Sequence, residues 1–454
     1  MKVSKRIISY QISGESILII NTLTGAVDII NPQVYQLLRG DFLPENPQID
    51  PEIITTLIKR GYLITNEDRE EQVLGHITEA YAKTQKRLTF VLCPTYSCNL
   101  KCTYCFEGEL TYDHSFMEKK DIDFVFAAID ELRRTHANRK HTITLFGGEP
   151  LLPKTKPLIS KILDEASKRS LPIHIVTNGT HLGRFTKELN INKSLIKSCQ
   201  VTLDGPKSIH DSRRKSTTGK GTFDLTCLAV DRLLDLQIKT TIRINADLQN
   251  IDSIPTLFEF ARLKGWIDNP LINFMISPVL DHSCKKSYAY FVPEDELVGR
   301  LLQVTKENPY LEKFLELGVF KTIGHISAVI RGGRPFQPLL YYCEANNLEQ
   351  IVFGPDGYIY PCTECMGNRE FALGEFKPYL KLYDEIIKMW NERTILSMEK
   401  CRECDIALLC GGGCAYSALM VNGDINQPVC NRARETIFAY LGSIKDELLL
   451  KANA

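Results

Sequence analysis

Three cysteines lie within one eight-residue segment, CNLKCTYC, as Cys98, Cys102 and Cys105. A loop with three thiolates can hold three irons of a four-iron four-sulfur cluster and leave the fourth iron open. An amine and a carboxylate of one small molecule can then chelate the open iron. The alternative is a zinc site, but zinc normally takes paired cysteines and four protein ligands. The CxxxCxxC spacing therefore favours a cluster with one open iron.

A second group of cysteines follows the pattern Cx13Gx4C, a gap, Cx2Cx5Cx3C, a gap and C. Its seven members are Cys343, Cys362, Cys401, Cys404, Cys410, Cys414 and Cys430. The alternative to an iron–sulfur site is a zinc ribbon that uses two of the close pairs, but such a ribbon leaves three of the seven without a role. Four further cysteines, Cys93, Cys199, Cys227 and Cys284, lie in apolar or unpatterned surroundings, which is typical of small buried side chains.

Composition excludes several classes of function. The chain has 454 residues, including 15 cysteines, and its 55 basic and 55 acidic residues cancel. No global field therefore attracts nucleic acid or an anionic membrane surface. No stretch approaches the roughly 18 unbroken apolar residues of a membrane span, and the start lacks the features of a signal peptide. We expect a cytoplasmic protein with no membrane or nucleic-acid partner, whose cysteines bind metal rather than form disulfides.

The elements that position the first cysteines alternate as strand and helix units do. Apolar runs predict parallel strands over 88–92, 142–146, 173–177, 200–203, 240–245 and 272–277. The fold class is therefore α/β, with a partial (β/α)6 barrel whose chemistry lies at the carboxyl ends of the strands. Four conspicuous segments fall there: the cysteine loop, residues 147–150 (GGEP), residues 178–179 and residues 204–205.

The first 75 residues have a different order, in which strands over 6–11, 16–20 and 26–30 precede helices. Asn31 and Pro32 supply an N-cap and a first-turn proline for a helix to about Leu38, and a second helix is expected over 51–59. A wing strand is expected at 62–64. This order predicts a small winged-helix-like module.

The motifs resemble the radical S-adenosylmethionine (SAM) superfamily, because CxxxCxxC follows the first barrel strand and Tyr104 precedes the last cysteine. The resemblance implies that Cys98, Cys102 and Cys105 ligate the SAM-binding cluster. It also implies that Gly147, Gly148, Glu149 and Pro150 bind the methionyl amine. Asn178 and Arg214 resemble positions near the SAM ribose and carboxylate, although a turn or surface role for each is an open alternative.

The second cysteine group resembles the SPASM domain, which holds two auxiliary four-iron four-sulfur clusters and brings the total to three. By position, the outer ligands are Cys401, Cys404, Cys410 and Cys430, and the inner ligands are Cys343, Cys362 and Cys414. The inner set is one ligand short. Either its iron is open to a substrate thiolate, or Cys365 closes it.

The N-terminal module resembles the RiPP recognition element, which takes up a leader peptide by β-augmentation. The alternative is a folded extension that packs on the barrel. We therefore expect a recognition module at 1–75, a helical linker at 76–86, a radical SAM barrel at 87–280, a helical bridge at 281–340 and a SPASM domain at 341–454.

SPASM proteins act mostly on peptides, so the resemblance implies a peptide maturase of the sactipeptide or ranthipeptide type. The expected partners are a precursor peptide with its leader and an electron donor such as flavodoxin or ferredoxin. The favoured product is a thioether from cysteine to carbon; a carbon–carbon crosslink, an epimer or an oxidised residue is the alternative. A further alternative is an anaerobic sulfatase maturase, which oxidises cysteine or serine to formylglycine. In that family an Asp follows the second SPASM cysteine, and Thr363 stands there in this chain, which makes this alternative less favoured. A non-enzymatic electron-transfer protein is a further alternative.

Overall fold

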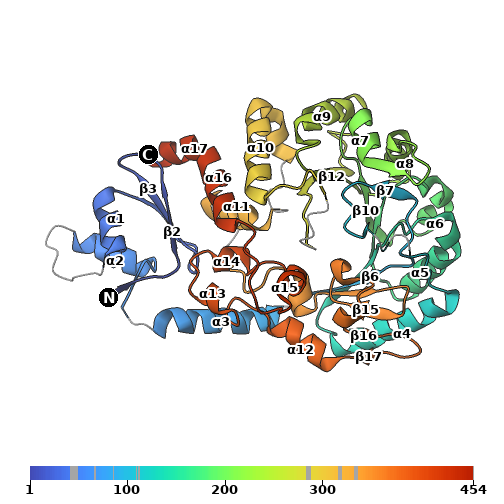
Figure 1. The fold of residues 1–454 in the computed structure, drawn as a ribbon, viewed down its shortest axis with the longest axis horizontal. Helices are drawn as coiled ribbons and strands as arrows, with labels where there is room; N and C mark the ends of the chain where they lie inside the picture. The colour runs from blue at the N-terminus through green and yellow to red at the C-terminus, as the bar shows by residue number, and fades with distance from the viewer. Residues whose placement is uncertain are drawn as a thin grey trace.

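The computed structural model describes residues 1–40, 50–65, 68–84, 86–108, 110, 113–282, 288–314, 320–331 and 336–452. Three parts follow one another along an elongated molecule (Figure 1). The N-terminal module lies at one end, the barrel at the other, and the cysteine-rich C-terminal region lies between them. One hydrophobic cluster includes buried side chains from all three parts, such as Leu18, Phe90 and Trp390.

The barrel contains the six parallel strands expected from the sequence. Their order in the sheet is β13-β12-β10-β9-β8-β6. The strands are β6 (Arg87–Leu92), β8 (Lys140–Leu145), β9 (Ile173–Thr177), β10 (Ile196–Thr202), β12 (Thr240–Ala246) and β13 (Ile272–Pro278). Their helices are α4 (Lys119–Thr135), α5 (Lys156–Lys168), α6 (Thr186–Ile191), α7 (Lys207–Arg213), α8 (Phe223–Asp235) and α9 (Ile254–Leu263). The partial (β/α)6 barrel is confirmed.

The sheet continues beyond the six barrel strands into the region after residue 341. Strand β14 (Gln350–Phe353) from the C-terminal region pairs in parallel with β6, with Gln350 opposite Thr89. The antiparallel strands β15 (Tyr358–Tyr360), β16 (Gly374–Glu375) and β17 (Lys381–Leu382) extend it further. Barrel and C-terminal region therefore share a single ten-stranded sheet.

The first cysteine loop is held by a small hairpin of its own. Strand β7 (Leu100–Cys102) pairs antiparallel with β11 (Arg214–Ser216), so that Cys102 lies opposite Arg214. A segment more than a hundred residues away in the chain thus fixes the middle of the loop.

The N-terminal module has the expected three strands, β2 (Ile7–Gln11), β3 (Ile17–Asn21) and β4 (Val27–Ile30), in one antiparallel sheet. Helix α1 (Pro32–Arg39) is capped by Asn31, whose side chain accepts from the Val34 amide, and α2 (Pro51–Lys59) follows. The expected wing strand is β5 (Leu63–Ile64), but it pairs with β1 (Lys2–Val3), which the sequence did not reveal. Helix α3 (Asp68–Thr84) leads to the barrel.

The remaining segments are mainly helical. Helices α10 (Glu294–Glu307) and α11 (Lys321–Arg331) form the expected bridge. The helices of the C-terminal region are α12 (Asp384–Glu392), α13 (Glu399–Arg402), α14 (Ala407–Cys410), α15 (Ala415–Asn422), α16 (Ala433–Ser443) and α17 (Lys445–Ala452). Helix α16 returns to the N-terminal module, where the rings of Phe438 and Tyr10 lie 6.0 Å apart. Both ends of the chain therefore contribute to one packed junction.

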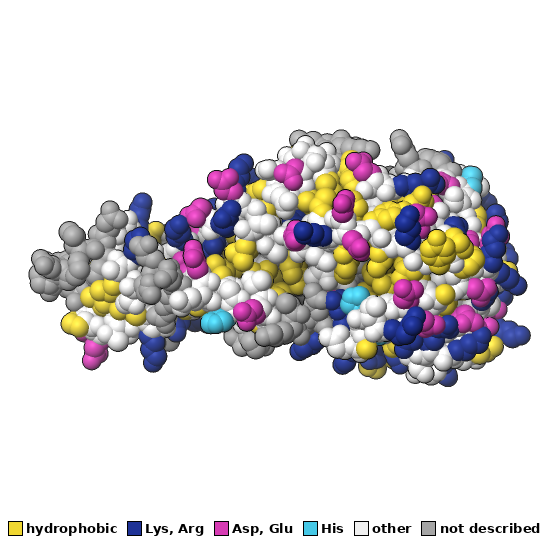
Figure 2. Space-filling model, turned by 90° about the horizontal axis from the view of Figure 1, so that it is seen from below, with side chains coloured by type: hydrophobic (Ala, Val, Ile, Leu, Met, Phe, Trp, Pro, Cys, Tyr) yellow, Lys and Arg dark blue, Asp and Glu magenta, His cyan; other side chains and the backbone are white. Residues whose placement is uncertain are grey.

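The surface fits the balanced charge of the sequence, because lysines, arginines and carboxylates are interspersed over the face seen in Figure 2. Within the described ranges, no helix is long and apolar enough to cross a membrane. Cys93, Cys199 and Cys227 are buried in the core, as expected of small apolar side chains. Cys284 lies outside the described residues.

Candidate functional site

A cavity of about 340 Å³ opens at the carboxyl ends of the barrel strands. The side chains of Cys98, Cys102 and Cys105 line it together with GGEP residues and Asn178, Arg214 and Asn245. Residues separated by more than a hundred positions are thus brought to one place by the parallel strands. This is where chemistry is found in barrels of this kind.

The three thiols of the loop lie close enough to influence one another. Burial raises the pKa of Cys98 well above its usual range, and the charges of Glu149, Cys102 and Cys105 raise it further. Burial also raises the pKa of Cys105 to about 12, as do Glu107 and Cys102. Burial in this wall disfavours the thiolate forms that a cluster needs, and the positive charge of bound iron would favour them.

Two glycines of the GGEP segment let it pack directly against the main chain that precedes Cys98. A Cβ at Gly148 would lie 2.1 Å from the carbonyl oxygen of Tyr96 and 2.4 Å from that of Ser97. Gly147 has a φ of 121°, which favours glycine. The Gly148 and Glu149 amides also donate to the carbonyls of Thr95 and Ser97. Here the two glycines hold the cysteine loop against the end of β8.

Glu149 is buried, and both of its carboxylate oxygens accept hydrogen bonds from the protein. Oε1 accepts from the Leu151 amide at 2.8 Å and from the Thr177 hydroxyl at 2.6 Å, while Oε2 accepts from the Asn178 amide at 2.7 Å. The carboxylate therefore joins the end of β8 to the end of β9. Its position beside Cys98 is the expected one, and a role toward a methionyl amine stays a prediction.

Asn178 lies in the same wall, with its side chain held by neighbours. Its Nδ2 donates to Asn99 Oδ1 at 2.9 Å and lies 4.0 Å from Cys98 Sγ, and its Oδ1 accepts from the Thr180 amide and hydroxyl. Asn178 thus fixes the orientation of the cysteine loop in this structure. A contact to ribose stays a prediction.

Arg214 lies on the other side of the loop. Its Nη1 donates to the hydroxyl of Tyr104 at 2.6 Å, while its Nε is buried without a hydrogen-bond partner. The hydroxyl of Tyr104 in turn donates to Asp204. An orphaned guanidinium nitrogen in the cavity wall fits an anionic group such as the carboxylate of SAM.

The sequence did not reveal the network behind this wall. Arg213 is fully buried, and its Nη1 donates to both oxygens of Asp247 at 2.6 and 2.7 Å. Its Nε lies 3.6 Å from Asp204, and its guanidinium covers the Tyr104 ring at 4.7 Å. Of the two neighbouring arginines, the sequence predicted only Arg214 as a candidate site residue. Asp204 was visible in the sequence only as part of an Asp-Gly turn, which gives no sign of a buried ion pair.

The wall opposite the barrel comes from the C-terminal region, where Thr363 and Glu364 line the same cavity. Burial raises the pKa of Glu364 to about 7, and His282 acts against that rise. Glu107 follows the cysteine loop on the same cavity; burial raises its pKa to about 8, as does Glu364, and its Oε1 has no hydrogen-bond partner. The cavity therefore reaches from the first cysteine triplet to the segment that carries Cys362.

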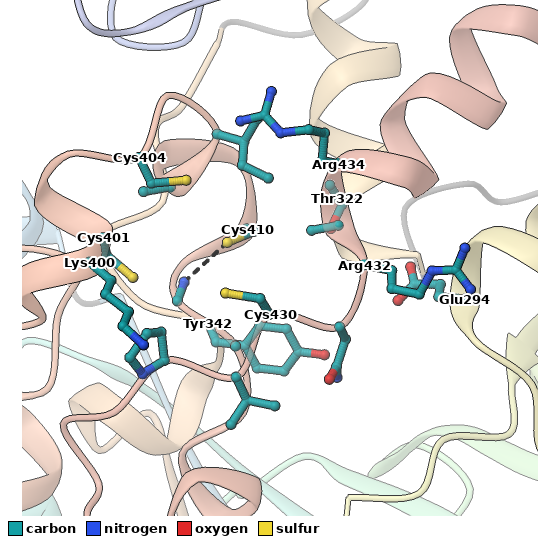
Figure 3. Close-up of a pocket in the computed structure, with 18 of the residues that line it drawn as sticks. Glu294, Thr322, Tyr342, Lys400, Cys401, Cys404, Cys410, Cys430, Arg432 and Arg434 are labelled. Carbon is teal, nitrogen blue, oxygen red and sulfur yellow. Dashed lines mark hydrogen bonds between the residues drawn. The ribbon is translucent and has the colours of Figure 1, made fainter.

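A separate cavity of about 280 Å³ is lined by Cys401, Cys404, Cys410 and Cys430. These are the four cysteines expected as outer ligands, and their sulfur atoms surround one space in Figure 3. The Gly412 amide donates to Cys410 Sγ at 3.4 Å. Such bonds to sulfur are typical of iron–sulfur sites.

The expected inner ligands also come together. Burial raises the pKa of Cys343 to about 12; Lys321 lowers it, and Cys414 and Cys362 raise it again. Cys365 is fully buried, with its Sγ 3.4 Å from that of Cys362. Its pKa is raised by burial and then by Cys362 and Cys414. Cys365 thus lies with the inner cysteines rather than apart from them.

The sequence is similar to a known protein family and to enzymes of known activity. Residues 92–261 match the model of the radical SAM superfamily. This chain carries a radical SAM domain. A cysteine-type anaerobic sulfatase-maturating enzyme of Clostridium perfringens is 25% identical over 334 residues, which cover 70% of this chain and 85% of that protein. The superfamily expectation is therefore confirmed.

Two solved structures share the fold over most of their length. Native anSMEcpe with bound AdoMet and Cp18Cys peptide has a TM-score of 0.60 and 21% identity, and the match covers 81% of this chain and 99% of that one. SuiB of Streptococcus suis, bound to the precursor peptide SuiA, has a TM-score of 0.56 and 15% identity, with 94% and 98% covered. Both matches agree with the expected α/β fold.

The residues present fit the groups that the radical SAM domain implies. Within the described ranges, no group of three or more His, Cys, Asp or Glu side chains is arranged to hold a single metal ion. Cysteine thiols line two cavities, and Arg214, which has an orphaned guanidinium nitrogen among the described residues, lines one of them. Soft thiolate sets of this kind suit iron–sulfur clusters.

Proposed function

We propose that this chain is a radical SAM enzyme that modifies a ribosomally made peptide. The observation that carries the proposal is the single cavity that reaches from the first cysteine triplet to the Thr363 and Glu364 segment. A substrate side chain in this cavity has the SAM-binding site on one side and the inner cysteines on the other. When bound, SAM and the cluster of the first triplet supply abstraction of a hydrogen atom from carbon.

The residues of the chain have distinct tasks in this proposal. Cys98, Cys102 and Cys105 hold the cluster, and Arg214 binds the carboxylate of SAM. Glu149 orients the Asn178 amide and the end of β9, and so keeps the cavity wall in place. The buried ion pair behind Tyr104 holds that wall rigid.

The partner that we propose is a precursor peptide. SuiB is bound to a precursor peptide and anSMEcpe to a Cp18Cys peptide in their structures. Residues 1–75 make up about a sixth of this chain, so a match to SuiB that covers 94% must include most of them. This supports a leader-binding role for the N-terminal module, in which β4 is hydrogen-bonded to β3 and has no second partner strand among the described residues. An edge strand of this kind can accept an extended peptide.

The finer proposal is formation of a thioether between a substrate cysteine and carbon. The reaction breaks one C–H and one S–H bond and forms one C–S bond, so the peptide loses two hydrogens and keeps its sulfur. The radical derived from SAM would take the hydrogen atom of the C–H bond, solvent would take the proton of the thiol, and a cluster held by the inner cysteines would accept the one remaining electron. The second candidate is oxidation of cysteine to formylglycine, which removes the sulfur. It is favoured by the similarity to the cysteine-type sulfatase maturase. Mass spectrometry of a treated cysteine peptide distinguishes the two products, because the thioether keeps the sulfur atom and formylglycine has lost it.

The basic claim is tested with SAM and dithionite under anaerobic conditions. We expect the wild-type protein to form 5′-deoxyadenosine and the Cys102→Ala variant to form none. Cys227→Ala is the matched control, because Cys227 is a buried core residue of α8 that lines neither cysteine cavity. The absence of 5′-deoxyadenosine from wild-type protein with full iron content would show that the chain is no radical SAM enzyme.

The form of the inner site is tested with Cys365→Ser. If Cys365 closes the inner cluster, the variant changes the electron paramagnetic resonance (EPR) spectrum of the reduced auxiliary clusters. No open iron is then left to bind the thiolate of a substrate cysteine, and thioether formation loses its main support. If the inner cluster has an open iron, Cys365→Ser leaves the EPR spectrum of the auxiliary clusters unchanged. Addition of a cysteine peptide then changes that spectrum.

A further inference from the structure

A single arginine lies fully buried in the C-terminal region, directly after helix α12. The side chain of Arg393 has no exposed surface. Its Nε donates to the carbonyl of Ile425 at 2.5 Å and its Nη2 to the carbonyl of Gly412 at 3.0 Å. Arg393 thereby ties the end of α12 to the middle of the segment between Cys410 and Cys414.

Among the described residues, the charge of Arg393 has no carboxylate partner. There its Nη1 is buried without a hydrogen-bond partner, and its Nε and Nη2 donate to main-chain carbonyls. Arginine does not lose its proton in proteins. A buried and unpaired charge is costly, so a negative group is expected beside it.

The negative groups that Arg393 can meet are cysteine thiolates of both auxiliary sites. Burial lowers the pKa of Arg393, whereas ionised Cys414, Cys343, Cys401 and Cys410 raise it. Two of these cysteines belong to the expected inner set and two to the outer set. The hydrogen bond to the Gly412 carbonyl holds Arg393 against the segment that joins an outer cysteine, Cys410, to an inner one, Cys414.

The segment between Cys410 and Cys414 has a backbone conformation that brings a carbonyl group to Arg393. Gly411, Gly412 and Gly413 follow one another with φ values of 67°, 81° and 79°, a conformation that favours glycine. Three such residues turn the chain sharply between Cys410, which lines the outer cavity, and Cys414, which does not. The carbonyl that Arg393 binds is that of the middle glycine.

We propose that Arg393 is the positive counter-charge shared by the two auxiliary iron–sulfur sites, and that it favours one-electron reduction of the clusters held there. The inference rests on the proposed function, because it requires that both cysteine sets hold clusters. Each cluster with its thiolates is negative and gains one more negative charge when it takes an electron from a reductant. A fixed guanidinium in a medium of low dielectric stabilises the reduced form more than the oxidised form.

The test measures reduction potentials of the auxiliary clusters without peptide. The full-length chain carries alanine at positions 98, 102 and 105, so that only the auxiliary clusters give a signal. After iron and sulfide analysis, each protein is titrated with dithionite and followed by EPR. We expect Arg393→Gln to weaken reduction of at least one cluster tenfold or more, which equals about 59 mV for one electron. Arg393→Lys should restore most of the difference.

The matched control is Arg432→Gln. Arg432 lines the outer cavity, but it is half-exposed and pairs with Asp295 at 2.9 Å and Glu296 at 3.3 Å. Its charge is already balanced, so we expect a change well below tenfold.

Each result decides the proposal. If Arg393→Gln loses the clusters and Arg393→Lys retains them, the proposal is supported. Glutamine and lysine both donate hydrogen bonds, but only lysine carries a positive charge. Two outcomes overturn it: unchanged potentials in fully loaded Arg393→Gln, or equal cluster loss in both variants. Absence of auxiliary clusters from the parent chain contradicts the cluster assignment itself, whereas 5′-deoxyadenosine formation by wild-type protein tests the enzyme separately.

Discussion

Arg6 joins the N-terminal module to the loop that carries two of the outer cysteines, and its removal gives a direct test of that junction. The side chain is buried, with 4% exposed. Its Nη1 donates to the carbonyl of Cys404 at 2.6 Å, and its Nη2 to the carbonyl of Arg402 at 2.7 Å. A hydrogen bond from a charged group contributes roughly 1.5–3 kcal/mol, so Arg6→Met should cost about 3–5 kcal/mol of local stability.

Hydrogen exchange followed by mass spectrometry measures this loss where it occurs. Because about 1.4 kcal/mol equals a tenfold change, the amides of residues 401–405 in Arg6→Met should exchange at least about 100-fold faster than in wild-type protein. Met keeps most of the apolar volume, so the change reports on the hydrogen bonds.

Lys5→Ala is the control for that measurement. Lys5 pairs with Glu403 of the same loop, but both side chains are mostly exposed, at 63% and 67%. An exposed pair contributes about 0–1 kcal/mol, so exchange should change less than about fivefold. If Arg6→Met changes exchange no more than Lys5→Ala does, the buried bonds do not hold the junction and the reasoning fails.

Three further substitutions test other parts of the structure. Gly148→Ala places a Cβ 2.1 Å from the Tyr96 carbonyl, so we expect loss of iron from the first triplet, measured by iron analysis, while the auxiliary clusters stay loaded. Arg213→Leu leaves Asp247 buried and unpaired, and should lower the free energy of unfolding in urea by about 3–5 kcal/mol. Burial raises the pKa of Glu294 from 4.5 to about 7, so folding holds a proton that the unfolded chain releases, and stability falls as pH rises from about 4.5 to 7. Glu294→Gln should remove that fall and be more stable than wild-type protein at pH 8 by up to about 3 kcal/mol; equal urea midpoints at pH 8 would contradict this.

The parts of the fold that the sequence predicted are those with local signals. The six barrel strands are short apolar runs, and the caps of α1 and α2 are recognisable from residues next to them. The two cysteine groups are visible because their spacing is regular, and each group comes together in space. Spacing alone did not decide where Cys365 lies; its burial beside Cys362 follows from packing.

The parts that escaped prediction depend on contacts between distant segments. Arg393 and Arg6 are single polar residues in sequences without periodicity, and their roles appear only when carbonyl groups from other elements surround them. The same holds for β1, whose two residues carry no strand signal until β5 lies beside them. Most arginines in proteins are exposed, so a sequence alone does not indicate which arginines are buried.

The position of β14 has a consequence for how the two cysteine regions work together. Strand β6 leads into the loop of Cys98, and it pairs with β8 on one side and β14 on the other. Strand β14 leads through β15 to Cys362, so one set of main-chain hydrogen bonds fixes the distance between the first triplet and the inner cysteines. A slip of one residue between β6 and β14 would move the inner cysteines by roughly 3.3 Å and turn every side chain of β14 to the other face. The register of this sheet, rather than a hinge between domains, therefore relates the segment of Cys362 to the first triplet.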